Sequence, residues 1–209
     1  MIYVPDRRLH LPPPTKIELA TIPMLGALVE IGAWDRNGRL FHQKREPSRS
    51  PVKQFLQWLC LHIQGVTITI TETDGTTTAV APGTGVMDGM AALDDDTHGI
   101  VIGTGSTAVD ITDSKLATQI LQGSTSLKMV YNADGGDIDV TVADPNCTFA
   151  KWRNFNNNSG ASITVAETGI YVRISSYVIN LCIVRDIPTA VAVPDGGGCY
   201  VKYTLKITE

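Results

Sequence analysis

Hydrophobic and polar residues alternate with a period of two through much of the second half of the chain. The segments 138–142, 170–174 and 201–208 place an apolar residue at every second position. This spacing is typical of β-strands that bury one face and expose the other. The nearly continuous apolar run 177–184 lacks the alternation and predicts a central strand.

Two segments in the first half have the pattern of β-hairpins. Asp-Arg-Asn-Gly at 35–38 divides two strand-like runs within residues 25–45, and Asp-Gly at 74–75 divides two more within residues 66–82. Both turn sequences favour the tight connections of antiparallel strands. Many short strands with turns at this spacing predict a mainly β fold, arranged as an antiparallel β-sandwich or jelly roll.

The segment between Ser50 and Gly65 instead has the spacing of an amphipathic helix. We expect Ser50 to cap this helix, Pro51 to begin it and Gly65 to end it. One face carries six apolar residues: Val52, Phe55, Leu56, Leu59, Cys60 and Ile63. Trp58 and Leu61 point away from that face, so we expect a second partner for the helix, in this chain or in another subunit.

Residues 1–15 predict an extended arm. Four prolines, three of them consecutive at 12–14, exclude a helix and favour polyproline geometry. The apolar side chains that we expect to lie on a neighbouring subunit are Ile2, Tyr3, Val4 and Leu11. The expected organisation is therefore an arm at 1–15, a hairpin and helix at 16–65, and a β-sandwich at 66–209.

Composition supports a folded core, because 43% of the 209 residues are hydrophobic and 18% are charged. The net charge of −4 argues against general binding to nucleic acid. Residues 36–53 nevertheless hold six basic residues and one Glu, so this segment carries +5 and the rest of the chain −9. We interpret the segment as a solvated hairpin and loop; the alternative is contact with an acidic subunit or with nucleic acid. That contact would involve Arg36, Arg39, Lys44, Arg45, Arg49 and Lys53.

The cysteines do not have the spacing of a metal site. There is no CxxC motif and no His/Cys cluster among Cys60, Cys147, Cys182 and Cys199. We therefore expect free thiols in a reducing cytosol, and no zinc. A signal-peptide pattern is absent, and no apolar run approaches the ~18 residues that a membrane-spanning helix needs.

The sequence contains a dinucleotide-binding fingerprint, G-x-G-x-x-A, at Gly103, Gly105 and Ala108. Its glycines serve a pyrophosphate only where a helix begins inside the motif and points its N-terminus at the phosphates. Here strand-like residues 109–112 follow, and the next helix-like segment, 114–121, begins too late. We therefore expect a turn between strands, with no nucleotide and no other cofactor.

Three adjacent carboxylates, Asp94, Asp95 and Asp96, lie in a Gly- and Asp-rich loop at 83–98. Calcium prefers several oxygen ligands, but this spacing does not match an EF-hand loop. We interpret the run as a solvated acidic loop, with a calcium site as the alternative. His98 is the residue that would join an acid site here.

Motifs of nucleophilic or zinc-dependent catalysis, such as G-x-S-x-G and H-E-x-x-H, are absent, so we do not expect an enzyme. A carboxylate pair of a glycoside hydrolase stays open, because its members can be distant in sequence. Aromatic residues make up only 6% of the chain, which leaves little material for a glycan-binding platform. The aromatic candidates are Trp152, Phe155, Tyr171 and Tyr177.

Three stretches of the C-terminal half resemble a recurrent module in structural proteins of tailed bacteriophages. They are NFNNNSGASITVAETGIYV (154–172), LCIVRD (181–186) and VAVPDGGGCYVKYTLKI (191–207). The module joins an N-x-S-G-x-x-I-x-V-x-E-x-G stretch, an apolar strand ending in Arg-Asp, and a Val-Pro-x-Gly turn before a final alternating strand. GIVIGTGSTAVDITDSKLATQI (99–120) is also similar to phage virion segments in which G-T-G precedes a short helix.

The resemblance implies a structural subunit of a tailed-phage virion, in the capsid, neck or tail. Such a subunit would assemble with copies of itself and with other virion proteins in the cytoplasm of the bacterial host. Trp58 and Leu61 join the apolar residues of the arm as expected interface residues. The alternatives are a host-receptor or glycan-binding module of a tail tip or fibre and, third, a virion-associated hydrolase. No small-molecule substrate and no membrane contact are expected.

Overall fold

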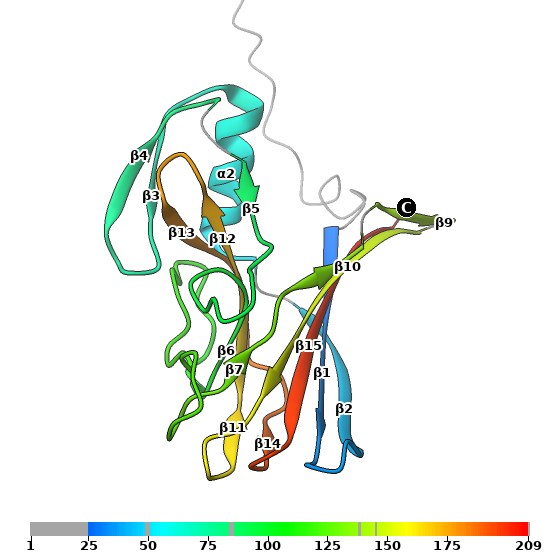
Figure 1. Ribbon diagram of the computed structural model, residues 1–209. Coiled ribbons are helices and arrows are strands. Elements are labelled where there is room, and N and C mark those ends of the chain that lie inside the picture. Colours follow the sequence, from blue (N-terminus) through cyan, green and yellow to red (C-terminus); the bar gives the residue numbers. More distant parts are fainter. Residues whose placement is uncertain (1–24, 49–50, 84–85, 138, 145, 209) are drawn as a thin grey trace, which may run out of the picture.

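The computed structural model describes residues 25–48, 51–83, 86–137, 139–144 and 146–208. The described chain is mainly β, with antiparallel sheets and helix α2, which confirms the fold class that the alternation predicts (Figure 1). The elements are β1 (Leu25–Trp34), β2 (Leu40–Ser48), α2 (Lys53–Gln64), β3 (Ile68–Thr71), β4 (Thr77–Val80), β5 (Met87–Asp88), β6 (Gly99–Gly103), β7 (Val130–Tyr131), β8 (Gly135–Gly136), β9 (Thr141–Ala143), β10 (Asn146–Asn156), β11 (Ile163–Val165), β12 (Glu167–Ile174), β13 (Ile179–Asp186), β14 (Val191–Val193) and β15 (Gly198–Thr208).

The larger sheet joins the two ends of the described chain. Its strand order is β2-β1-β15-β10-β7, and β8 and β9 pair with β10 at other points along that strand. β1 pairs with β15 over its whole length, from Leu25 opposite Ile207 to Trp34 opposite Gly198. The N-terminal hairpin is therefore part of the same sheet as the C-terminal strand.

The hairpin of β1 and β2 has the turn that its sequence predicts. Asp35 Oδ1 accepts hydrogen bonds from the backbone N–H groups of Asn37 (2.8 Å) and Arg39 (3.1 Å). Gly38 has a φ of 74°, which a residue with a Cβ rarely adopts. The second predicted hairpin is also present, as β3 and β4 joined across Gly75.

The second sheet has the order β13-β12-β5, and β6 pairs with β12. The alternation of residues 170–174 predicts one wet face for β12, and this is wrong, because Tyr171 is buried as well as Val172. The irregular loop 104–121 covers the second face, where the Tyr171 hydroxyl accepts a hydrogen bond from the Leu116 N–H (2.6 Å). Because the loop has no regular hydrophobic spacing, the sequence does not predict that it buries the second face of β12.

Two predictions for the covering loop are also wrong. Residues 114–121 form no helix, and residues 109–112 form no strand. Several backbone N–H groups of the loop are bonded to a side chain of the sheet instead. Glu167 accepts hydrogen bonds from Ala117 (2.7 Å) and Thr118 (3.1 Å). A distant carboxylate therefore satisfies donors that a helix would have paired locally.

Strand β13 begins later than its apolar run predicts. The run starts at Tyr177, but residues 175–178 form the turn that leaves β12, and the strand starts at Ile179. Val178 lies in this turn with a φ of 56°, which is unusual for a β-branched residue. Apolar character alone therefore overestimates the length of the strand.

Helix α2 ends as predicted but begins differently. Gly65 ends the helix with a φ of 63°, and its N–H donates to the Leu61 carbonyl (3.0 Å). Val52 occupies the N-cap position without a side-chain hydrogen bond. Pro51 forms a β-bridge with Val184 instead of starting the first helical turn.

The helix buries Leu61 of its second face, while the predicted inner face is only partly covered. Leu61 is 1% exposed, whereas Leu56 and Ile63 of the predicted inner face are 62% and 79% exposed. The buried face packs on β13 and β3, and Trp58 also packs against the core, with its ring 4.2 Å from that of His62. Hydrophobic spacing identifies residues that share a face, but not which of two apolar faces meets a sheet.

Both larger sheets contribute to one apolar core. Ile31, Val201 and Tyr203 of the larger sheet are fully buried in it, as are Ile102 and Leu181 of the second sheet. This arrangement is compatible with the expected sandwich. Among the described residues, no helix is long and apolar enough to span a membrane.

Candidate functional site

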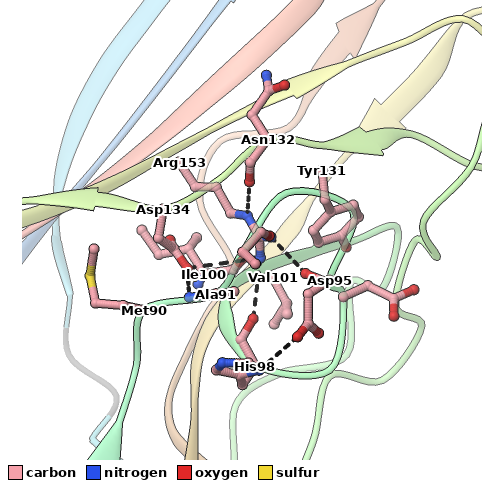
Figure 2. Close-up of polar contacts among 12 residues, drawn as sticks. Met90, Ala91, Asp95, His98, Ile100, Val101, Tyr131, Asn132, Asp134 and Arg153 are labelled. Atoms are coloured by element: carbon pink, nitrogen blue, oxygen red, sulfur yellow. Dashed lines mark hydrogen bonds and ion pairs between the residues drawn. The ribbon is translucent and has the colours of Figure 1, made fainter.

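Arg153 of β10 is the centre of a buried polar cluster next to β6 (Figure 2). Its Nε donates to the Asn132 carbonyl (2.6 Å), and its guanidinium lies 4.9 Å from the centre of the Tyr131 ring. Its two terminal nitrogens donate, at 2.6–3.2 Å, to the carbonyls of Ala92, Asp95, His98 and Ile100. All five donors of the guanidinium are therefore used within the chain.

Asp134 lies beside Arg153 with its side chain fully buried. Its Oδ1 is 3.1 Å from Lys151 Nζ, and its Oδ2 accepts a hydrogen bond from the Ala91 N–H (2.9 Å). Gly99 makes room for this carboxylate, because a Cβ added there would lie 1.9 Å from Oδ2. Burial raises the pKa of Asp134 against the attraction of Lys151, and burial lowers the pKa of Lys151 against the attraction of Asp134.

Catalytic sites also contain clusters of residues with shifted pKa values. The contacts of the Arg153 cluster must therefore show whether its role is catalytic or structural. The His98 carbonyl accepts a hydrogen bond from Arg153, and His98 Nδ1 lies 3.2 Å from Asp95 Oδ2. The other acceptors of the guanidinium are main-chain carbonyls of β6 itself and of the irregular segments before β6 and after β7. The cluster thus fastens these segments to β10, and a buried carboxylate and five carbonyls depend on one side chain.

A second buried arginine, Arg185, lies near the end of β13. Its Nε donates to Glu167 Oε1 (2.6 Å), and a terminal nitrogen donates to Asp113 Oδ2 (2.6 Å). Its terminal nitrogens also donate to the carbonyls of Thr107 (2.9 Å) and Ala108 (3.3 Å). Burial alone would lower the pKa of Arg185, but the hydrogen bonds and charges of the two carboxylates outweigh it and raise this pKa. This cluster holds the covering loop on the second sheet.

The glycines of the G-x-G-x-x-A motif make room for the same cluster. A Cβ added at Gly103 would lie 2.7 Å from Glu167 Oε2, and one added at Gly105 would lie 2.4 Å from it. β6 ends at Gly103, and residues 104–110 have no regular structure. The prediction that no helix begins inside the motif is confirmed. A carboxylate of the chain itself lies where a nucleotide site would need a phosphate.

Two shallow depressions lie over the covering loop, with volumes of about 280 and 360 Å³. Ligand sites typically hold roughly 300–1,000 Å³ and converge several polar groups on the ligand. The buried polar side chains that line these depressions, Arg185 and Tyr171, already bind groups of this chain. The most deeply buried polar side chains of the two depressions therefore hold the chain itself together.

The three aspartates of the acidic loop all accept hydrogen bonds within the chain. Asp94 and Asp96 accept from the side-chain and backbone N–H groups of Gln122, at 2.6 and 2.7 Å. Asp95 accepts from the Thr97 hydroxyl (2.6 Å). No group of three or more potential metal ligands forms among the described residues. The description as a solvated loop is incomplete, because these carboxylates fix the loop in place.

The interface residues expected in the helix have different surroundings. Leu61 is a core residue of this chain, so its expected contact with another subunit is wrong. Trp58 is partly buried and packs against the same core. The arm residues Ile2, Tyr3, Val4 and Leu11 lie outside the described residues, as do Ser50 and Arg49.

The four aromatic candidates do not form an exposed platform. Phe155 and Tyr171 are buried in the core. Trp152 is partly exposed on the outer face of the larger sheet, with its ring over Gly135. Tyr177 lies in the turn between β12 and β13. These four residues together are therefore wrong as a glycan-binding surface.

The basic segment forms the turn and edge strand of the N-terminal hairpin. Lys44 pairs with Glu46 (2.5 Å), and Arg45 pairs with Glu30 (2.8 Å). Part of its positive charge is therefore neutralised within the sheet. Its other basic residues in the described chain are exposed: Arg36, Arg39 and Lys53.

The residues of the phage-like motifs fasten turns. Asn157 is fully buried, and its Nδ2 donates to the carbonyls of Ala161 and Val193, both at 2.8 Å. The Gly160 N–H donates to Asp195 Oδ1 (2.8 Å), which joins the turn before β11 to the Val-Pro-x-Gly turn after β14. The Asn-x-Ser-Gly and Val-Pro-x-Gly sequences therefore belong to one structural unit.

The remaining candidate is an apolar surface that the sequence did not identify. One end of β10 and β15, together with β9, diverges from the second sheet (Figure 1). Residues directly opposite one another in antiparallel strands share a face. Cys147 lies between Val142 and Ile207, and Phe149 lies opposite Leu205. We call these five residues the tip face.

The tip face continues the side of the larger sheet that faces the core. Further along the same strands, Arg153 and Tyr203 on this side are fully buried. At the tip, Val142 is 75% exposed, Ile207 49% and Phe149 40%. The four cysteines of the chain are unpaired, and Cys147 places a partly buried thiol in this surface. No protein-family model, curated protein or solved structure matches this chain.

Proposed function

We propose that this chain is a structural subunit of a tailed-phage virion that acts through symmetric self-assembly and through contacts with other virion proteins. The observation that carries the proposal is the tip face. Single exposed apolar residues are normal on protein surfaces, whereas a contiguous apolar surface marks an interaction site. Here the surface is the uncovered continuation of the inner side of a sheet, so covering it would extend the core.

Two further observations support a role without catalysis. Arg153 and Arg185 are deeply buried, and all five donors of Arg153 and four donors of Arg185 bind groups of this chain. Residues 154–172, 181–186 and 191–207, which resemble the phage module, supply turns and strands of the scaffold. A subunit of an assembly needs a rigid scaffold and exposed contact surfaces, and these features provide both.

The test compares the mass of the full chain in solution with that of two matched variants. Val142→Asp places a charge in the tip face, and Val86→Asp places one at an equally exposed valine elsewhere, since the two side chains are 75% and 76% exposed. Light scattering over a range of concentrations should show an oligomer for the wild type and for Val86→Asp. Val142→Asp should weaken association by about tenfold or more, because a buried valine contributes about 1.5 kcal/mol.

A wild-type chain that stays monomeric at every concentration would contradict self-assembly. A monomer that binds surface glycans in an array would instead support the receptor-binding alternative. Equal masses for Val142→Asp and the wild-type oligomer would show that association uses another surface than the tip face.

A further inference from the structure

We propose that the tip face is the binding site for residues 1–15 of a neighbouring copy of this chain. This inference rests on the self-assembly proposed above and names the partner of the tip face. The occupant is chosen on three grounds: the shape and chemistry of the surface, its charge, and the point at which the chain before β1 reaches it.

The surface suits an extended apolar segment. Its residues come from three adjacent strands, with Val142 of β9, Cys147 of β10 and Ile207 of β15 in one row. Neighbouring strands lie ~4.8 Å apart, so this row presents a narrow apolar strip across the sheet. The arm carries three consecutive apolar residues, Ile2, Tyr3 and Val4, and its prolines favour an extended conformation that can lie flat on such a strip.

The charges next to the strip match those of the arm. Asp139 and Asp144 are exposed on either side of β9. Arg7 and Arg8 follow the apolar residues of the arm directly, after Pro5 and Asp6. Opposite charges at the edge of an apolar contact favour one partner and one orientation.

The described chain enters β1 at this end of the sheet. β1 begins at Leu25, directly opposite Ile207 of the tip face. The fifteen residues of the arm span up to ~50 Å when extended, and nine further residues separate Thr15 from Leu25. Pro12–Pro14 favour an extended chain, and the proposal therefore assigns Ile2–Val4 to the tip face of a neighbouring copy.

Cross-linking between two chains with different cysteines tests the inference. The donor carries Asp6→Cys, Cys147→Ser and Cys60→Ser, and the acceptor carries Cys60→Ser and keeps Cys147 in the tip face. Burial raises the pKa of the remaining thiols, Cys182 and Cys199, so they stay protonated and unreactive at pH 7. A control acceptor has Cys60→Ser, Cys147→Ser and Val86→Cys, which moves the reactive thiol to a more exposed position outside the tip face.

Donor and acceptor should give a bis-maleimide cross-link at least about tenfold more often than donor and control acceptor, since docking holds the two thiols at millimolar effective concentration. Equal yields from both acceptors, in mixtures that light scattering shows to be associated, would overturn the arm as occupant and leave self-assembly standing. A chain that carries both Asp6→Cys and Cys147, and that cross-links to itself at high dilution, would overturn the neighbour as its source. Mixtures that remain monomeric would overturn the inference together with the proposed function.

Discussion

At the scale of single residues, the carboxylate of Glu167 explains why glycine stands at 103 and 105. Its two oxygens accept hydrogen bonds from the covering loop and from Arg185, and the glycines leave the space that it fills. The spacing that resembles a nucleotide site thus has a steric cause inside the protein. A side chain at either position would overlap the Glu167 carboxylate. In the same way, a side chain at Gly99 would overlap the carboxylate of Asp134.

Gly105→Ala should therefore destabilise the protein by about 1–3 kcal/mol, because the new methyl overlaps the Glu167 carboxylate. Gly26→Ala is the matched control, since a Cβ at Gly26 has no atom within 4 Å. Urea denaturation of both variants measures the difference in the free energy of unfolding. Equal stabilities would mean that Glu167 can move aside without loss.

Glu30 predicts a dependence of stability on acid. Burial alone would raise the pKa of Glu30, but hydrogen bonds from Tyr200, Gln43 and Arg45 and the charge of Arg45 outweigh it and lower this pKa below 4.5. The ionised carboxylate therefore stabilises the fold above pH 4.5, and this contribution is lost as the pH falls through the lowered pKa. Glu30→Gln should cost about 1 kcal/mol at pH 7, and the difference from wild type should shrink towards pH 3 in urea titrations. A difference that is constant with pH would contradict this.

Tyr200 predicts the opposite dependence at high pH. Burial, together with its hydrogen bond to Glu30 and the charge of that carboxylate, raises the pKa of Tyr200 from 10.0 to about 12. The neutral phenol therefore stabilises the fold below pH 10, and this contribution is lost as the pH rises from 10 to about 12. Thermal unfolding of Tyr200→Phe should show a smaller loss of stability over that interval than the wild type. An equal loss of stability in Tyr200→Phe and the wild type would mean that groups other than Tyr200 cause the loss.

At the scale of elements, helix α2 shows what the hydrophobic pattern can and cannot predict. Its position, its end at Gly65 and the presence of two apolar faces follow from spacing and turn chemistry. Which face is buried depends on β13 and β3, whose positions are set by distant pairings. The face that contains Leu56 and Ile63 has more apolar residues, yet Leu61 of the other face is the residue that is buried.

Leu61→Ala and Ile63→Ala form a matched pair on this helix. Leu61→Ala should destabilise the protein by about 2–5 kcal/mol, since it leaves a cavity in the core. Ile63→Ala should change the free energy of unfolding by less than about 0.5 kcal/mol, because its side chain is mostly exposed. Chemical denaturation distinguishes them, and the reverse order would restore the sequence-based orientation of the helix.

The buried arginines are the part of the site that spacing could not predict. Arg153 and Arg185 occupy core-facing positions of their strands. A charged residue at such a position breaks the alternation of apolar residues that predicts a strand. Their partners are mostly carbonyls of irregular loops, and carbonyls are present at every residue, so no sequence signal identifies them. The strands themselves, by contrast, repeat a period of two and were predictable.

Arg153→Met should cost about 3–5 kcal/mol, because it leaves five carbonyls without their donor and removes one of the two cations beside Asp134. Lys151→Met should cost less, since Asp134 keeps its hydrogen bonds from backbone N–H groups. Hydrogen exchange of the amides in residues 91–100 should rise in the first variant and stay near wild type in the second. Unchanged protection in Arg153→Met would show that the loop holds itself.

At the scale of the whole molecule, the two sheets diverge at one end, and this divergence defines the proposed interface. The tip of β10, β15 and β9 runs away from β12 and β13 (Figure 1). The apolar side of the larger sheet therefore loses its cover there, which exposes the tip face. The strand patterns predict an apolar side for each strand, but the point where its cover stops depends on how the sheets meet.

A map of an intact virion by electron cryo-microscopy tests the central claim most directly. Virions purified from cells that make this chain should contain its fold at positions repeated by the symmetry of the particle. In such a map, density from another chain should cover Val142, Phe149 and Ile207 of each copy. A particle without this fold, or one in which the tip face of every copy is open to solvent, would contradict the account.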